Sequence, residues 1–205
     1  MTVATTSVET NPIVLRMPPA LDMNDEQFFE LCQINRELRI ERTSNRELII
    51  MPPTGSQTSD KNSEINFQLR LWNRQSKLGK VFESSGGFKL PNGAARSPDA
   101  SWVQLERWQA LSREQRRGFA PLCPDFVIEL RSPSDRLEAL DNKMNEYLDN
   151  GAKLGWLIDP DHRQVYIYRT GADVEQLDNP ATVKGDESLL PGFVLVMEEI
   201  WLESV

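Results

Sequence analysis

The octapeptide Pro124-Asp125-Phe126-Val127-Ile128-Glu129-Leu130-Arg131 predicts an apolar strand that also carries acidic residues. Side chains alternate between the two faces of a strand. One face carries Asp125, Val127, Glu129 and Arg131, and the other carries Phe126, Ile128 and Leu130. Glu129 stands out, because a carboxylate within an apolar run is destabilising unless a cation or a hydrogen bond compensates its charge. The strand therefore marks a candidate site.

Amphipathic helices are predicted before and after this strand. The spacing of Ile65, Leu69 and Trp72 is that of one face of a helix. The predicted helices cover residues 22–35, 61–77 and 137–150, and the last two end at Gly79 and Gly151. Helices thus flank the strand on both sides along the chain.

Most other periodic segments predict strands. They cover residues 38–42, 47–51, 80–84, 87–90, 99–103, 153–158 and 164–169. Residues 104–120 are polar and rich in arginine, and they predict a short helix or a mobile loop. Strands fill the middle of the chain and helices bracket them, so the expected class is α/β or α+β with a mixed sheet.

The length of 205 residues predicts one compact domain. We expect this domain over residues 21–205, preceded by a loose arm over residues 1–20 that shows no periodicity. No apolar run approaches the ~18–20 residues needed to span a bilayer, and the N-terminus lacks the pattern of a secretory signal. The expected location is therefore the cytoplasm, with no membrane partner.

The composition excludes several kinds of site. Cys32 and Cys123 are too few for a disulfide framework, and neither lies at a metal-ligand spacing from the one histidine, His162. A catalytic triad would have to use His162, which we do not expect to be catalytic. Catalysis would have to come from carboxylates, lysine, arginine, tyrosine and a bound ion. The net charge of −8 argues against tight nonspecific binding to phosphate backbones.

Two more carboxylates belong with Glu129. Asp99 begins a predicted strand, and Glu64 lies near the apolar arc of a predicted helix. If Asp99 and Glu129 lie on neighbouring strands and point the same way, they form a pocket for a hard divalent cation, Mg²⁺ or Mn²⁺. Such an ion lowers the pKa of bound water and stabilises a phosphodiester oxygen. The alternative is that Glu129 and Arg131 form an ion pair with each other or with a neighbour, and that Asp99 is a turn acid.

These residues also carry a family resemblance. Pro98-Asp99, followed later by Glu129-Leu130-Arg131, resembles the PD-(D/E)XK signature of restriction-endonuclease-like phosphodiesterases. Five blocks in order resemble more closely the bacterial Uma-type family, which is grouped with endonucleases and described as a domain of unknown function. The blocks are RSPDASWV (96–103), PDFVIELRSPSD (124–135), KMNEY (143–147), GWLIDP (155–160) and LPGF (190–193). The resemblance covers about residues 20–202.

The resemblance implies a restriction-endonuclease-like fold, with a central mixed sheet flanked by helices. It implies that Asp99 and Glu129 are metal ligands and that Glu64 is the helix carboxylate that assists them. The general signature has a lysine two residues after the acid, where this chain has Arg131. Arginine stays protonated, so it can hold a phosphate but cannot deprotonate water. In the resembling family the lysine lies on the following helix, and Lys143 matches that position.

The expected activity follows from the resemblance. It is that of an endonuclease that hydrolyses DNA phosphodiester bonds with Mg²⁺ or Mn²⁺, in which Lys143 orients or activates water and Arg131 contacts phosphate. The alternative is a noncatalytic binding or interaction module that keeps the fold and uses the acids in structural pairs. A glycosidase with two carboxylates is disfavoured, because nothing indicates a sugar cleft. A homodimer would suit the cutting of both strands of a duplex.

Overall fold

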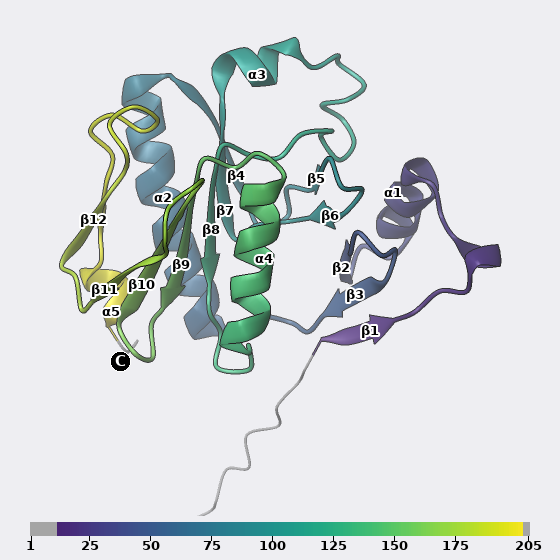
Figure 1. Cartoon of the computed structure of the whole chain (residues 1–205), viewed down its shortest axis with the longest axis horizontal. Helices are drawn as coiled ribbons and strands as arrows, with labels where there is room; N and C mark the ends of the chain where they lie inside the picture. The colour runs from purple at the N-terminus through teal and green to yellow at the C-terminus, as the bar shows by residue number, and fades with distance from the viewer. Residues whose placement is uncertain (1–11, 203–205) are drawn as a thin grey trace, which may run out of the picture.

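The structure is a computed structural model that describes residues 12–202 (Figure 1). Its centre is a six-stranded main sheet with the order β11-β10-β9-β8-β7-β4. The strands are β4 (Gly79–Glu83), β7 (Ala100–Gln104), β8 (Phe126–Leu130), β9 (Leu154–Asp159), β10 (Gln164–Arg169) and β11 (Glu175–Asp178). β8 and β9 run parallel, and the other neighbours run antiparallel. The predicted mixed sheet is therefore confirmed.

Two helices cover opposite faces of the main sheet (Figure 1). They are α2 (Ser56–Ser76) and α4 (Leu137–Asp149). Leu69 of α2 belongs to the same core cluster as Phe126, whereas Met144 of α4 belongs to a second cluster with Val127. The alternation predicted for β8 is thus observed, because its apolar residues divide between two cores. Glu129 lies on the Val127 face and so points toward α4.

A second sheet, antiparallel and five-stranded, has the order β1-β3-β2-β6-β5 and lies beside the main sheet together with helix α1 (Figure 1). Its elements are β1 (Ile13–Leu15), the short 3-10 helix η1 (Pro19–Leu21), α1 (Asp25–Ile34), β2 (Arg39–Arg42), β3 (Leu48–Met51), β5 (Phe88–Lys89) and β6 (Ala95–Arg96). The predicted hairpin of β2 and β3 is confirmed, and so is α1, which Asn24 caps through a capping box. A small core of Phe28, Ile40, Leu48 and Ala95 holds this unit together.

The loose arm expected over residues 1–20 is described only from residue 12 onward, so its first part lies outside the described residues. Within the described part, Ile13–Leu15 form the edge strand β1 and pair with β3. The pairing partner lies far along the chain, which is why the local pattern did not predict this strand.

The end of α2 differs from the prediction. Gly79 is the first residue of β4 and does not end the helix. Lys77 ends it instead, with a left-handed backbone at φ 58°. A Cβ on Gly79 would lie 2.3 Å from the Trp102 ring and from the Val103 carbonyl oxygen, so glycine is needed there for close approach of two strands. At the other end, α2 begins at Ser56, earlier than the predicted residue 61.

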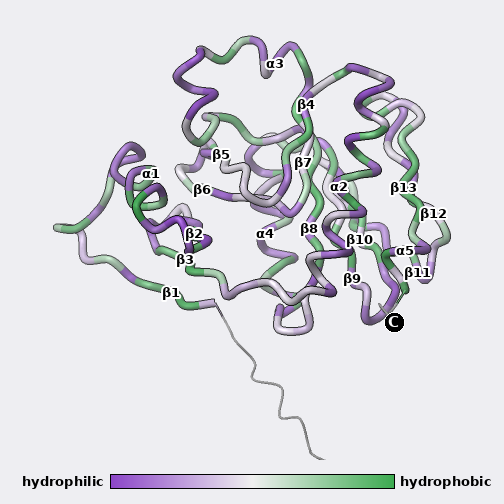
Figure 2. The backbone as a smooth tube through the Cα atoms, turned by 180° about the vertical axis from the view of Figure 1, so that it is seen from behind, coloured by the Kyte–Doolittle hydropathy of each residue, from purple (hydrophilic) through white to green (hydrophobic). Residues whose placement is uncertain are grey.

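The remaining elements pack mainly against α2, β4 and β7. They are α3 (Leu105–Ala110), β12 (Thr182–Lys184), β13 (Val194–Val196) and α5 (Glu198–Trp201). Figure 2 shows hydrophobic residues concentrated along the strands of the main sheet and hydrophilic residues along the loop after α3. Between residues 12 and 202, no helix combines the length and the apolar character needed to cross a membrane.

Candidate active site

The two central acids come from neighbouring strands. β7 and β8 pair with Ala100 opposite Ile128, so the next step of the register places Asp99 opposite Glu129 on the same face. The backbone N–H of Leu130 donates to Asp99 Oδ2 at 3.0 Å. Asp99 is 8% exposed and Glu129 is 3% exposed. The structure therefore brings Asp99 and Glu129 together as a buried acid pair.

Helix α4 brings a lysine to this acid pair. Lys143 Nζ lies 2.9 Å from Glu129 Oε1 and 3.1 Å from Glu41 Oε1. The hydroxyl of Tyr147 donates to Glu129 Oε1 at 2.9 Å. Lys143 and Tyr147 are four residues apart and therefore share one face of the helix. The lysine that the resemblance placed on this helix thus contacts the acid.

The second sheet contributes a third acid that the sequence reasoning missed. Glu41 on β2 is 1% exposed and accepts hydrogen bonds from Lys143, from Arg96 Nη1 at 3.0 Å and from the backbone N–H of Ser97 at 3.0 Å. Arg96 in turn donates from Nε to Glu146 of α4 at 2.6 Å. Glu41 therefore joins the second sheet to α4 through two buried cations.

Arg39, on the same face of β2, reaches the acid pair itself. Its two terminal nitrogens lie 3.4 Å from Asp99 Oδ1. A signal for both residues was present in the sequence, because Arg39 and Glu41 alternate with Ile40 in a strand-like run. The criterion that singled out Glu129, an acid within a strand, applies equally to Glu41.

Burial and neighbouring charges set the protonation of these groups. Burial raises the pKa of Glu129 to about 7; the nearby carboxylates of Asp99 and Glu41 add to this, whereas Lys143 opposes it. Burial also acts to raise the pKa of Glu41, but Lys143 and Arg96 outweigh it and lower that pKa to about 2. Burial acts to lower the pKa of Lys143, and Glu129 and Glu41 outweigh it and raise that pKa. Lys143 is therefore an ammonium group at neutral pH.

Glu64 is not brought to the acid pair. Its Oε1 accepts a hydrogen bond from the Gln68 amide at 2.9 Å, and Gln68 exchanges two hydrogen bonds with the backbone of Val196. Asn66 is the residue of α2 that reaches the acids, since its amide donates to the backbone carbonyl of Asp99 at 2.9 Å. Two residues apart on a helix point about 200° apart, so Glu64 faces away from the acids.

Arg131 is also held elsewhere. It donates from Nη1 to Asp159 Oδ2 at 2.5 Å and from Nε to the backbone carbonyl of Asp135 at 3.2 Å. The same Nη1 lies 3.3 Å from His162 Nδ1. Arg131 follows the last residue of β8 and turns toward the end of β9. The structure therefore does not bring it to Asp99 and Glu129.

The acid pair has the chemistry of a site for a hard divalent cation. Asp99 and Glu129 offer carboxylate oxygens, and Glu129 Oε2 accepts no hydrogen bond from residues 12–202. Burial and then the neighbouring carboxylates raise the pKa of Glu129, and a divalent cation beside it would favour its charged form. No group of three His, Cys, Asp or Glu side chains that could hold a metal occurs in the described part of the chain. The two acids would therefore hold such an ion without a third acidic side chain.

Comparisons with known proteins agree with this architecture. The crystal structure of a putative nuclease belonging to DUF820 from Anabaena variabilis ATCC 29413 has the same fold, with a TM-score of 0.71. It is 22% identical, and the alignment covers 87% of this chain and 97% of that one. No curated protein matches the chain. The family model Uma2, described as "Putative restriction endonuclease", matches residues 25–198, which include the main sheet, the second sheet apart from β1, and all three acids. The chain therefore belongs to the Uma2 family of putative restriction endonucleases.

Proposed function

We propose that this protein is a metal-dependent endonuclease that hydrolyses phosphodiester bonds of DNA. The observation that carries the proposal is the meeting of Asp99, Glu129 and Lys143 in one buried site, from β7, β8 and α4. Two carboxylates and a lysine are the groups of the PD-(D/E)XK signature, and membership of the Uma2 family supports the same chemistry. Burial supports it further, because a site of low dielectric strengthens the action of each charge.

Asp99 and Glu129 would hold the ion, Mg²⁺ or Mn²⁺. When bound, it would offset charge on the phosphate and lower the pKa of a neighbouring water. The chain prepares both acids for this task. The Leu130 N–H orients Asp99, and the Tyr147 hydroxyl orients Glu129. Such supporting hydrogen bonds fix the direction of ligand oxygens.

Lys143 supplies a positive charge next to the reacting groups. Glu129 and Glu41 keep it protonated, so in this state it donates hydrogen bonds and does not remove a proton. An ammonium group held in place stabilises negative charge that develops on a phosphate, and it orients water. Glu41 is a positioning residue, because it contacts Lys143 and Arg96 and neither acid of the pair.

Plasmid nicking in Mg²⁺ or Mn²⁺ tests this proposal. We expect Asp99→Asn, Glu129→Gln and Lys143→Met each to lower the nicking rate at least roughly 100-fold. Glu64→Gln is the matched control, since it removes the same kind of charge from a residue that faces away from the acids. It should cut within about twofold of wild type. Unchanged nicking by Asp99→Asn would show that the active site is wrongly assigned.

Metal binding is measured separately by calorimetric titration with Mn²⁺. Wild type should bind the ion, and Asp99→Asn should bind it more weakly. Lys143→Met should lower turnover much more than metal affinity, because Lys143 is not one of the proposed ligands. Absence of Mn²⁺ binding to wild type at millimolar concentration would remove the basis of the metal-dependent mechanism.

The second candidate is a noncatalytic module that keeps the nuclease fold. The observation that favours it is that each buried acid already has a cation: Asp99 has Arg39, Glu129 has Lys143, and Glu41 has Arg96. Such pairs can serve to hold the two sheets and α4 together. In that case wild type nicks no DNA with either ion, while the same substitutions still lower the free energy of unfolding.

A further inference from the structure

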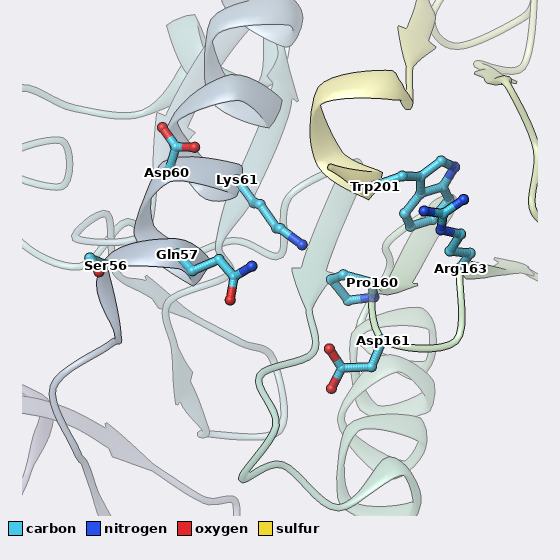
Figure 3. Close-up of a pocket in the computed structure, with 8 residues that line it drawn as sticks. All are labelled: Ser56, Gln57, Asp60, Lys61, Pro160, Asp161, Arg163 and Trp201. Atoms are coloured by element: carbon cyan, nitrogen blue, oxygen red, sulfur yellow. The ribbon is translucent and has the colours of Figure 1, made fainter. Parts of the chain in front are cut away.

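A separate cavity of about 810 Å³ lies at the N-terminus of α2 (Figure 3). Its walls come from the first turns of α2, the turn between β9 and β10, and α5. The residues used below are Ser56, Gln57, Asp60, Lys61, Asp161 and Arg163. The volume lies within the roughly 300–1,000 Å³ typical of ligand sites. None of the residues of the acid site lines it.

Lys61 is the first feature that points to a ligand. The residue is only 7% exposed, and no acceptor among residues 12–202 forms a hydrogen bond or an ion pair with it. Figure 3 shows its side chain extended from α2 toward Pro160 across the cavity. Its Nζ keeps contact with the open cavity, since it is not one of the fully buried unpartnered atoms among residues 12–202, and an anion bound there would gain a charge-assisted hydrogen bond.

The start of α2 is the second feature. Gly55 at the N-cap supplies no side-chain hydrogen bond, and the first turn contains no acidic residue. Within the described residues, no acceptor bonds the backbone N–H groups of Ser56, Gln57 and Thr58. The macrodipole of a 21-residue helix adds positive potential at this end. Free N–H groups and a positive dipole together form a ready site for an oxyanion.

The opposite wall carries one charge of each sign. Arg163 and Asp161 both lie on the exposed turn between β9 and β10. Arg163 adds a donor for an anion, whereas Asp161 and the exposed Asp60, which lines the α2 wall beside Lys61, oppose one. The charge of Asp161 is screened by water because the residue is exposed, so it weakens an anion site without abolishing it.

Both walls of the cavity connect to the end of the main sheet where the acid pair lies. On α2, Asn66 follows Lys61 by little more than one turn and contacts the backbone of Asp99 at 2.9 Å. On the other wall, Pro160 follows Asp159, which pairs with Arg131 beyond the end of β8. The cavity therefore lies at the same end of the central strands as the acids.

We propose that this cavity binds a phosphate group between the Lys61 ammonium and the first N–H groups of α2. A phosphodiester of a nucleic-acid strand and the phosphate of a free nucleotide present the same oxyanion. If a nucleic-acid strand occupies both the cavity and the acid site, that use of the cavity rests on the proposed nuclease function. The phosphate site itself rests only on the cavity.

Titration of the full chain with inorganic phosphate tests the site without any divalent ion. We expect saturable shifts of the Ser56 and Gln57 amide signals in NMR spectra. Lys61→Gln should weaken binding about tenfold or more, since a charge-assisted hydrogen bond is lost. Asp161→Asn should tighten binding a few-fold. Lys80→Gln, which removes an exposed lysine from β4, is the matched control and should bind as wild type does.

Two results would overturn the proposal: no saturable shift of these amides with wild type, or equal affinity in Lys61→Gln. Should Lys61→Gln fail to fold, Arg163→Asn and Asp161→Asn on the exposed turn carry the test, with binding weakened in the first and tightened in the second. Failure of wild type to nick DNA would leave phosphate binding intact, so the two proposals fail separately.

Binding of a labelled oligonucleotide, measured in the presence of a metal chelator, distinguishes the two sources of the phosphate. If the cavity binds a phosphodiester of a nucleic-acid strand, Lys61→Gln lowers the affinity for the oligonucleotide. It also reduces the slope of log affinity against log salt concentration by the amount expected for about one phosphate contact. If the cavity instead binds the phosphate of a free nucleotide, adenosine monophosphate competes with inorganic phosphate. The affinity for the oligonucleotide is then the same in Lys61→Gln and wild type.

Discussion

Glu129 and Glu41 are both buried strand carboxylates that contact the same lysine, yet their pKa values shift in opposite directions. Glu41 accepts from Lys143, Arg96 and the Ser97 N–H. Glu129 accepts from Lys143 and Tyr147 and lies beside two other carboxylates. The surroundings of each carboxylate, and not its residue type, therefore decide its charge.

Glu129→Gln should become more stable relative to wild type as the pH rises. The pKa of Glu129 is 4.5 in the unfolded chain and about 7 in the fold, so its contribution to stability is full below 4.5 and is lost as the pH rises through 7. The variant does not titrate, and the difference in free energy of unfolding should change by a few kcal/mol, on the order expected for such a shift. Urea unfolding across this range measures it. A difference independent of pH would contradict the prediction.

Glu41→Gln should show the opposite pH dependence. At neutral pH it should lower the free energy of unfolding by about 3–5 kcal/mol, because two buried cations lose their carboxylate. The loss should shrink as the pH falls from 4.5 toward about 2, where Glu41 of wild type is itself protonated. Glu64→Gln, with no buried cation, serves as control in the same unfolding series. A loss that stays constant with pH would count against the assigned ion pairs.

At the scale of elements, register and close approach place the site residues. The pairing of β7 with β8 sets Asp99 opposite Glu129, and the helical repeat of α4 aligns Lys143 with Tyr147. Close packing of α4 on β9 supports the placement of Lys143. Gly155 on β9 leaves room for the Met144 methyl group, which would lie 2.4 Å from an added Cβ. This approach holds α4 close against the main sheet, where Lys143 reaches Glu129.

Gly79→Ala should destabilise the fold by about 1–3 kcal/mol, a typical effect of overpacking. The added methyl group would meet the Trp102 ring and the Val103 carbonyl oxygen at 2.3 Å, and a backbone oxygen cannot move aside alone. Gly118→Ala is the control, because nothing lies within 4 Å of its added Cβ. Thermal unfolding compares the two variants. Equal unfolding temperatures would show that β4 and β7 do not pack this closely.

At the scale of the whole molecule, the acid site lies where the main sheet, α4 and the second sheet meet. The main sheet supplies Asp99 and Glu129, α4 supplies Lys143, and the second sheet supplies Arg39 and Glu41. With Arg96 of the second sheet, which pairs with Glu41, the group has three acids and three cations, so the net charge of −8 lies outside it. Long-range attraction to a phosphate backbone is therefore weak, and binding depends on local contacts.

DNA binding should accordingly be weak and should depend on a divalent ion. When a chelator removes divalent ions, the affinity for a short DNA duplex should fall with salt concentration only as steeply as expected for about one to three phosphate contacts. Mg²⁺ should raise the affinity of the Lys143→Met protein, in which cutting is blocked, because the ion offsets the charge of the acid pair. Fluorescence anisotropy measures both effects. Tight binding in a chelator with a steep salt dependence would contradict this account.

The sequence by itself determined the strands of the main sheet except β11, helix α4 and the division of β8 into two faces, because periodicity is a local property of the chain. It also singled out Asp99, Glu129 and Lys143, which the structure brings together. Only the tertiary structure decided which faces meet. It turned Glu64 away from the acids, tied Arg131 to Asp159 and placed Glu41 against Lys143. These outcomes depend on how a second sheet and a helix pack on the first, and such long-range packing leaves no local period in a sequence.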